Sequence, residues 1–333
     1  MSYNHSVVQM TGDLNLTLTI NHGYDRARPI EIGDVNVEGI DLDITHVPPG
    51  ELFTQLAAHP RAYEITEQSL SSHVLWTSKG ENPFVGIPVF PSRFFRHNCI
   101  YVHEDADIDE PTDLKGKTVG GFITYQETAV VMMRGMLDDE YGVSPSDVEW
   151  VFQSKERIPF NYPDDVSITH TTGNDNVLEM IGTGELDALL SPVMPPDLGD
   201  TVERLFEDFK KVEMDYFDRT NVFPIMHIIA VREDLIQENP WIATSLWDAF
   251  TEAKEKTMNR LYDTGGLAAT LPWLLDHIEQ TREVLGDDYW PYGFQNQVNY
   301  DTLNAICRYS YEHGLSERRV EPEELFLDEF LAK

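Results

Sequence analysis

Short stretches in which apolar and polar residues alternate recur along the chain, and longer stretches with helical periodicity separate them. The alternation in LNLTLTI and IDLDITH predicts strands at 14–20 and 40–46. Apolar runs bounded by turn residues predict further strands at 63–66, 85–90, 98–103, 148–152 and 221–231. Helices are predicted at 48–60, 128–143, 202–217, 240–262, 271–286, 300–314 and 321–332. The polar run EQSLSSHVL at 67–75 is predicted to be a turn.

Strands and helices therefore alternate, which is typical of an α/β protein with largely parallel sheets. The chain shows no repeat or linker, so domain boundaries are expected where a continuous chain crosses between sheets. We place these crossings near 104–115 and 218–224. They predict a discontinuous first lobe, 1–108 and 222–333, and an inserted second lobe, 109–221, with a ligand cleft between the lobes.

The bulk composition is that of a globular protein. The chain has 333 residues, 41% of them hydrophobic, and a mean hydropathy of -0.35. No apolar run approaches the roughly 20 residues that a membrane span needs, so no membrane association is expected. The N-terminal stretch MSYNHSVVQMTGDLNL does not resemble a secretory signal, and a cytoplasmic location is expected.

The chain is strongly acidic, with 58 Asp and Glu against 24 Lys and Arg and a formal net charge of -34. Nucleic acid is therefore not expected as a partner, because phosphate binding needs a basic face. The acid is spread along the whole chain, which favours a surface adapted to high salt and a halophilic source. Association into a homo-oligomer is left open.

One window, residues 82–103, contains no Asp or Glu and holds Arg93, Arg96 and His97 beside aromatic residues. An acidic protein that binds an anion must gather cationic side chains locally, and the planar fork of arginine matches a carboxylate. The window predicts a site for an anionic, aromatic small molecule. The alternative is that the arginines form ion pairs or are solvated beside a buried strand.

The turn GGFITYQETA at 120–129 is a second candidate, because Thr124, Tyr125 and Thr128 stand where a helix begins. Free N–H groups at a helix N-terminus attract anions. Thr124 is predicted to be the N-cap, with Glu127 completing a capping box. The turn lacks the spacing of a phosphate-binding loop.

His227 lies inside the apolar run NVFPIMHIIAV, where a histidine is more often a packed core residue than a catalyst. Its position at the return crossing favours a cleft residue, and imidazole is suited to proton transfer. Tyr24 and Arg26, after the first strand, are candidates for the cleft wall, although Arg26 could simply pair with nearby charges. The polar turn with Glu67 and Ser69 is a weaker candidate.

The chain contains no HExxH, CxxC or GxSxG motif and no dinucleotide fingerprint, so no organic cofactor is expected. The two cysteines, Cys99 and Cys307, lie among apolar residues and are expected to be inert. No metal signature is present, and metal independence is expected. A divalent ion held by His and carboxylate ligands from different loops stays open.

Several strings resemble the 4,5-dihydroxyphthalate decarboxylase family in order and spacing from about Leu14 to Phe326. They are YDRAR, IPVFPSRFFRHNCIYV, GKTVGG…TA…RGML..EYGV, FPIMHIIAVRE, LPW and YWPYG. The segment AYEITEQSLSS, which contains Glu67 and Ser69, departs from the acidic FDV-E-S pattern expected there.

The resemblance implies a two-lobed fold like the type II periplasmic binding proteins, with the ligand cleft between the lobes. It also implies that an aromatic dicarboxylate loses one carboxylate as CO2 to give 3,4-dihydroxybenzoate. Arg93, Arg96, His97 and His227 would be site residues. We expect the arginines to bind carboxylates, His227 to protonate the ring and His97 to contact substrate oxygens.

Two other functions fit the same fold. A solute-binding protein or cytoplasmic ligand sensor for an aromatic carboxylate would use the same arginines without turnover. A relative of the thiamin-pyrimidine synthases would be expected to carry a cysteine-rich motif and a cofactor-bearing lysine. The two isolated cysteines argue against that second alternative.

Overall fold

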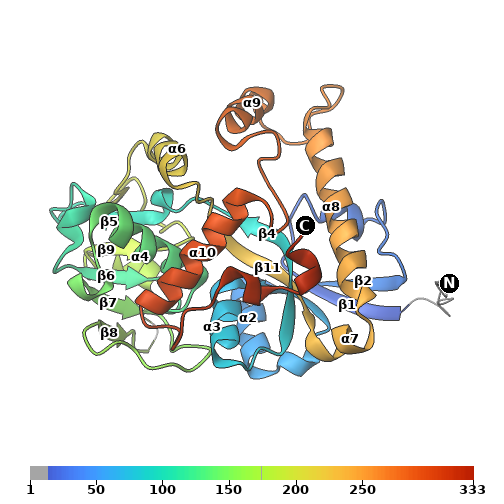
Figure 1. The fold of residues 1–333 in the computed structure, drawn as a ribbon. Helices are drawn as coiled ribbons and strands as arrows, with labels where there is room; N and C mark the ends of the chain where they lie inside the picture. Colours follow the sequence, from blue (N-terminus) through green and yellow to red (C-terminus); the bar gives the residue numbers. More distant parts are fainter. Residues whose placement is uncertain (1–13, 174) are drawn as a thin grey trace, which may run out of the picture.

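The computed structural model describes residues 14–173 and 175–333. The N-terminal residues on which the absence of a secretory signal was judged lie largely outside this range. Two sheets, each covered by helices, form two lobes that lie side by side (Figure 1). The strands of the first sheet lie on the right of the view and those of the second on the left. The chain is therefore an α/β protein with a two-lobed fold.

The first sheet has five strands in the order β2-β1-β3-β11-β4. β1, β2 and β3 are parallel, whereas β11 runs antiparallel to both of its neighbours. The sheet is thus mixed rather than largely parallel. Its strands are β1 (Leu14–Ile20), β2 (Ile40–His46), β3 (Ile65–Ser69), β4 (Phe84–Arg93) and β11 (Ile225–Arg232).

The second sheet has six strands in the order β10-β5-β9-β6-β7-β8. β9, β6, β7 and β8 are parallel, and β5 pairs antiparallel with β9 and β10. Its strands are β5 (Ile100–His103), β6 (Thr118–Gly121), β7 (Glu149–Phe152), β8 (Ser167–His170), β9 (Ala188–Leu190) and β10 (Val202–Arg204).

The chain passes from the first sheet to the second between Arg93 and Ile100, before the crossing predicted at 104–115. It returns between Arg204 and Ile225, an interval that contains the predicted 218–224. The acid-free window therefore includes the crossing itself. The division into a discontinuous first lobe, 1–108 and 222–333, and an inserted second lobe, 109–221, stays a prediction.

Helices cover both sheets. The longer ones are α2 (Pro49–Ala58), α3 (Leu70–Lys79), α4 (Thr128–Tyr141), α6 (Phe209–Thr220), α7 (Glu233–Glu238), α8 (Trp241–Leu261), α9 (Leu274–Leu285) and α10 (Gln297–Glu312). Single turns form α1 (Arg28–Glu31) and α5 (Val177–Met180). α10 packs against α4 of the second lobe and α3 of the first, so it joins the two lobes (Figure 1).

Three sequence predictions about helices were wrong. Residues 67–75 are not a turn but form the end of β3 and most of α3. This helix was not predicted because α3 is buried on several sides and lacks the amphipathic pattern of a surface helix. Residues 202–217 divide into the edge strand β10 and α6, whose N-cap is Asp208. The predicted C-terminal helix consists of two 3-10 turns, Pro322–Leu325 and Asp328–Phe330.

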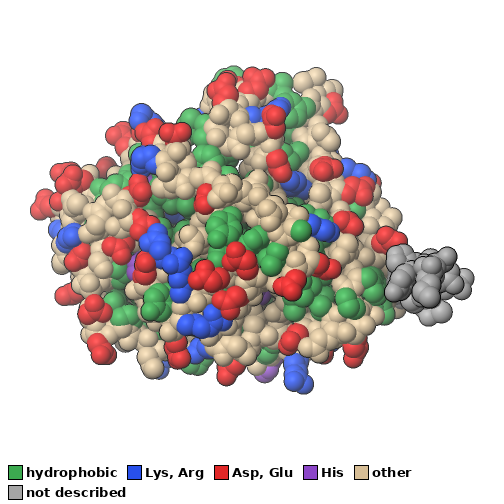
Figure 2. All heavy atoms as spheres, viewed as in Figure 1, with side chains coloured by type: hydrophobic (Ala, Val, Ile, Leu, Met, Phe, Trp, Pro, Cys, Tyr) green, Lys and Arg blue, Asp and Glu red, His purple; other side chains and the backbone are tan. Residues whose placement is uncertain are grey.

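The acidic composition is visible on the molecular surface. Asp and Glu side chains are spread over the face shown in Figure 2, and Lys and Arg lie among them. Within the described residues, no helix combines the length and the apolar character needed to cross a bilayer.

Candidate active site

Three polar side chains from neighbouring segments of the first sheet meet beside one another. Glu67 lies on β3, and His227 lies on the adjacent strand β11. Tyr24 follows β1, the other neighbour of β3, at its carboxyl end. Loops at the carboxyl ends of strands are where open α/β sheets place ligand contacts. The sheet order therefore brings together residues that are up to 203 positions apart in the chain.

The three side chains share one carboxylate oxygen. His227 Nδ1 lies 2.5 Å from Glu67 Oε1, and the Tyr24 hydroxyl donates to the same oxygen at 2.6 Å. The backbone N–H of Asn21 donates to Glu67 Oε2 at 2.7 Å. Because Nδ1 faces a carboxylate, it carries a proton, and Nε2 is the ring nitrogen that Glu67 does not engage.

The environment of Glu67 sets its charge. Its side chain is 0% exposed, and burial alone would raise its pKa. The charge and hydrogen bond of His227, with the hydrogen bonds from Tyr24 and Asn21, nevertheless lower the pKa of Glu67 below its usual value. Burial and the nearby Glu67 carboxylate raise the pKa of Tyr24 well above its usual value. Glu67 is thus a buried carboxylate, and Tyr24 is a neutral phenol that donates to it.

The backbone around His227 is irregular. The pairing of β11 with β4 shifts register on both sides of His227, between Ile225 and His227 and again between His227 and Ile229. Bulges of this kind re-aim a side chain and are common next to active sites. The His227 side chain is 12% exposed, so it is largely enclosed but accessible.

Phe53 and Arg157 complete this region from the two lobes. Phe53, on α2, packs edge-on against the His227 ring with 4.8 Å between centroids. Arg157 Cζ, from the loop after β7, lies 5.7 Å from the centre of the Phe53 ring. Arg157 Nη2 forms an ion pair with Glu127 at 2.8 Å, and its side chain is only 5% exposed. Among the described residues, Arg157 Nε and Nη1 have no hydrogen-bond partner.

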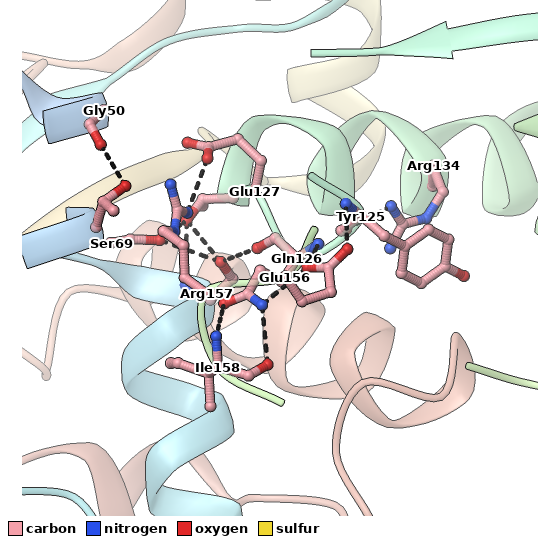
Figure 3. A network of polar contacts seen from close by, with 12 residues as sticks. Gly50, Ser69, Tyr125, Gln126, Glu127, Arg134, Glu156, Arg157 and Ile158 are labelled. Carbon is pink, nitrogen blue, oxygen red and sulfur yellow. Dashed lines mark hydrogen bonds and ion pairs between the residues drawn. The ribbon is translucent and has the colours of Figure 1, made fainter. Parts of the chain in front are cut away.

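The loop that carries Arg157 is held against the turn before α4. The Glu156 carboxylate accepts the backbone N–H groups of Tyr125 and Gln126 and the Gln126 side-chain amide. Gln126 also exchanges hydrogen bonds with the backbone of Ile158. Figure 3 shows Arg157 between these two fixed neighbours, with its side chain directed toward Glu127. The backbone on both sides of Arg157 is therefore fixed.

A cluster of hydroxyl groups joins the two lobes next to this loop. Thr128 Oγ1, in the first turn of α4, lies 2.8 Å from Ser69 Oγ and 3.0 Å from Ser71 Oγ. The Ser71 backbone N–H donates to the same threonine oxygen at 3.1 Å. The predicted residues Ser69 and Thr128 are therefore brought together, and both are buried. Ser69 is also the residue that pairs with His227 across β3 and β11.

Arg26 lies beside Tyr24, but its guanidinium is already engaged. Nε and Nη2 donate to the Pro91 carbonyl, and Nη1 pairs with Asp25. The guanidinium also stacks on Trp290 at 4.2 Å from the ring centre and lies 4.7 Å from the centre of the Tyr24 ring. These contacts favour a supporting role for Arg26 rather than direct ligand binding.

The two arginines of the acid-free window, Arg93 and Arg96, lie where the chain passes from the first sheet to the second. Arg93 donates to the carbonyls of Pro291 and Phe223 and to Asn299 Oδ1. Burial lowers the pKa of Arg93 to about 9. Arg96 is buried against the ring of Phe94, and its Nη1 lies 3.6 Å from Cys99 Sγ. These contacts favour a structural role for both arginines, and their predicted contacts with substrate are untested.

His97 is enclosed by aromatic rings near α6. Phe206 and Tyr216 pack edge-on against it, at 5.2 and 5.0 Å between ring centroids. Burial lowers the pKa of His97 to about 4, so the ring is neutral near pH 7. Within the described part of the chain, neither ring nitrogen has a hydrogen-bond partner. The aromatic rings account for the packing of His97, and its contact with substrate stays a prediction.

Thr124 and Tyr125 are buried in the turn before α4. The Tyr125 hydroxyl donates to the His313 carbonyl, and the Arg134 guanidinium lies 3.5 Å from the centre of the Tyr125 ring. Thr124 was wrongly predicted to cap the helix: α4 begins at Thr128, its N-cap is Glu127, and no side-chain cap forms. Ile123, with φ at +64°, turns the chain immediately before Thr124. Tyr125 therefore belongs to the packing of the second lobe.

Sequence reasoning missed Arg157 and Phe53 and gave Glu67 too little weight. A carboxylate in the middle of a strand is a signal, because a buried acid must be paired. Arg157 lies in a polar, proline-containing stretch that the periodicity did not resolve. Only the fold shows that this stretch faces α2 of the other lobe.

Two surface hollows lie away from this site. One polar hollow is lined by Asp139, Tyr216 and Arg308, and an apolar groove is lined by Phe95, Met214 and Leu285. In the part of the chain that is described, no three His, Cys, Asp or Glu side chains are grouped so that they could hold a metal ion.

Two solved structures with a similar fold are sulphonate-binding proteins. The aliphatic sulphonate binding protein SsuA from Escherichia coli has a TM-score of 0.55 at 15% identity, covering 97% of this chain and 100% of that chain. SsuA from Xanthomonas axonopodis pv. citri has a TM-score of 0.54 at 11% identity, covering 95% and 99%. These likenesses establish the two-lobed, type II periplasmic-binding-protein-like fold.

Sequence comparisons are more specific. The family described as NMT1/THI5 like matches residues 36–260. A 4,5-dihydroxyphthalate decarboxylase from Comamonas testosteroni is 37% identical over 322 residues, which cover 94% of this chain and 96% of that protein. A second, from Pseudomonas putida, is 37% identical over 188 residues, which cover 55% and 72%. On this identity over nearly its full length, the chain belongs to the 4,5-dihydroxyphthalate decarboxylase family, within the NMT1/THI5-like proteins.

Proposed function

We propose that the protein decarboxylates 4,5-dihydroxyphthalate to 3,4-dihydroxybenzoate and CO2, without an organic cofactor. The observation that carries this proposal is the buried Glu67 carboxylate bonded to Nδ1 of His227, whose side chain is still 12% exposed. A paired histidine of this kind can give a proton to carbon and recover it afterwards. Membership of the decarboxylase family supports the choice of substrate.

The reaction needs one proton added to the ring and one carboxylate removed. The hydroxyl para to the leaving carboxylate loses its proton, and its electrons flow into the ring. Nε2 of the His227 imidazolium then protonates the ring carbon that bears this carboxylate. The bond from that carbon to the carboxylate breaks, its electron pair restores the aromatic ring, and CO2 leaves. The phenol oxygen and the histidine recover their protons, so the net change is uptake of one proton and release of CO2.

Glu67 and Tyr24 support this step without touching the reacting carbon. The Glu67 carboxylate stabilises the imidazolium from the side of Nδ1 and fixes the orientation of the ring. Tyr24 and the Asn21 N–H hold Glu67 by donating to its two oxygens. Phe53, edge-on to His227, would provide an apolar wall for the substrate ring. Entry of the substrate would require the two lobes to separate where Ser69 meets Thr128.

Direct assay of purified protein tests the proposal. Incubation with 4,5-dihydroxyphthalate should release CO2 and 3,4-dihydroxybenzoate in equal amounts. Binding of the substrate without release of CO2 would instead support a solute-binding or sensor protein. We also propose that the partner in the cell is this small aromatic dicarboxylate and that the protein acts in the cytoplasm.

A further inference from the structure

Arg157 is a buried cation whose ion pair uses only part of its hydrogen-bonding capacity. Nη2 is paired with Glu127, whereas Nε and Nη1 are buried without a partner among the described residues. Buried polar groups are nearly always hydrogen-bonded, and unpaired donors on a charged group are costly. The arrangement is therefore one that an anionic ligand would complete.

The position of Arg157 relates it to the catalytic histidine. Arg157 and His227 contact the same ring, that of Phe53, with Arg157 coming from the second lobe and His227 from the first. The backbone of Arg157 is fixed between Glu156 and Ile158, which are both bonded to Gln126 (Figure 3). A rigidly placed guanidinium one aromatic ring away from the proton donor can orient a substrate of benzene size.

We propose that Arg157 binds the carboxylate that stays on the ring, and so makes the site selective for an aromatic substrate that keeps a carboxylate after CO2 leaves. This inference rests on the proposed function for the identity of the ring. The leaving carboxylate loses its charge as it becomes CO2, so a cation bound to it would stabilise the substrate more than the transition state. The retained carboxylate keeps its charge throughout, and binding energy at that group orients the ring without opposing the reaction.

Two probe molecules separate this role from simple structural support. One probe, 3,4-dihydroxybenzoate, carries only the retained carboxylate, and the other, 4-methylcatechol, replaces that carboxylate with a methyl group. Calorimetry would measure the affinity of the full-length protein for each probe. Arg157→Gln should lower the affinity for 3,4-dihydroxybenzoate by roughly 10- to 100-fold, which is the loss typical of one charged hydrogen bond. The affinity for 4-methylcatechol should not change.

A matched control is Arg219→Gln, which removes an arginine from a surface ion pair with Glu140. It should leave both affinities at the parent values. If Arg157→Gln lowers the affinity for both probes equally, or for neither probe, the proposed contact is wrong. Glu127→Gln supplies a second test that keeps Arg157: it should bind 3,4-dihydroxybenzoate at least as tightly as the parent, and weaker binding would overturn the proposal.

The outcome is distinguishable from that of the proposed function. Selective loss of 3,4-dihydroxybenzoate binding in a protein that releases no CO2 would refute decarboxylation but support the carboxylate site. Release of CO2 by the parent protein without selective loss in Arg157→Gln would refute the carboxylate site alone.

Discussion

Glu67 places a negative charge on the buried side of His227, opposite the nitrogen that would face substrate. Its oxygens accept from His227, Tyr24 and the Asn21 backbone, so the carboxylate stays ionised although it is fully buried. Because the pKa of Glu67 is lowered in the folded protein, its ionised carboxylate stabilises the fold at neutral pH. This contribution is lost as the pH falls through the pKa of Glu67 in the folded protein. The same carboxylate binds Nδ1 of His227 and so orients the ring for the proposed proton transfer.

Glu67→Gln tests this coupling. We expect kcat to fall by roughly 10²-fold, because the amide no longer stabilises the imidazolium. Measurement of kcat at pH 7, with folding verified by circular dichroism, tests this effect. An unchanged kcat in a folded variant would show that Glu67 does not support the proton transfer at His227.

Sequence reasoning at this scale depended on local context. His227 is recognisable because a polar ring interrupts an apolar strand. Arg93 and Arg96 attract attention in an acid-free window, yet backbone carbonyls occupy the Arg93 guanidinium, and Arg96 is buried against Phe94. The neighbours of Arg157, Glu156 and Ile158, are held by hydrogen bonds to Gln126, which lies 31 positions before Arg157 in the chain. No local sequence pattern predicts such a contact.

His97→Phe tests the packing role of His97. The pKa of His97 in the folded protein, about 4, lies below the usual histidine value of about 6.5. The unfolded chain therefore binds more protons, and stability falls as the pH drops from about 6.5 to about 4. Phenylalanine does not titrate, so the free energy of unfolding of His97→Phe should lose about 2 kcal/mol less than that of the parent between pH 7 and pH 5. Urea unfolding at both pH values measures the effect, with the exposed His59→Gln as control. A variant as acid-sensitive as the parent would contradict this assignment.

At the scale of elements, amphipathic and alternating segments were predictable and buried ones were not. β1 and β2 coincide with their predicted ranges, and α8 lies within its own. α10 overlaps most of its predicted range but begins three residues earlier, at Gln297. α3 was not predicted because its serines pack inside the protein. β10 was not predicted because its pairing with β5 overrides the helical periodicity of its sequence. The chain enters the second sheet after Arg93, earlier than 104–115. Both segments that flank this point are strands, and sequence does not show which sheet each one joins.

The contact of α4 with α10 depends on Gly135. A Cβ atom at this position would overlap the ring of Tyr309. Alanine gains about 1 kcal/mol of helix propensity, but overpacking costs about 1–3 kcal/mol, so Gly135→Ala should destabilise the protein. Chemical denaturation measures the change. In a Tyr309→Ala background the penalty should disappear, and an equal penalty in both backgrounds would contradict the contact.

At the scale of the whole molecule, the acidic surface and the two lobes are the dominant features. The charge of -34 is a property of composition and was evident from sequence. The two-lobed fold followed from the alternation of elements and the family resemblance, and structural comparison confirms it. The packing of α10 across both lobes was not predictable, because sequence pattern does not show which helices an apolar face contacts.

Salt should stabilise this protein, because screening reduces repulsion among the surface carboxylates. We expect Tm to rise between about 0.1 M and 1 M KCl, over which the Debye length falls from about 10 Å to about 3 Å. Differential scanning calorimetry measures Tm, and sucrose at equal osmolality controls for solute exclusion. A Tm that is constant or lower in KCl would contradict an adaptation to high salt.

The central claim is that His227 gives the proton that replaces the departing CO2. The most direct measurement is CO2 release from 4,5-dihydroxyphthalate by His227→Gln, compared with the parent protein and with His59→Gln. If the parent protein and His59→Gln release CO2 at equal rates while folded His227→Gln is slower by about 10²-fold or more, the claim holds. If His227→Gln folds and releases CO2 at the parent rate, another group supplies the proton and the account is wrong.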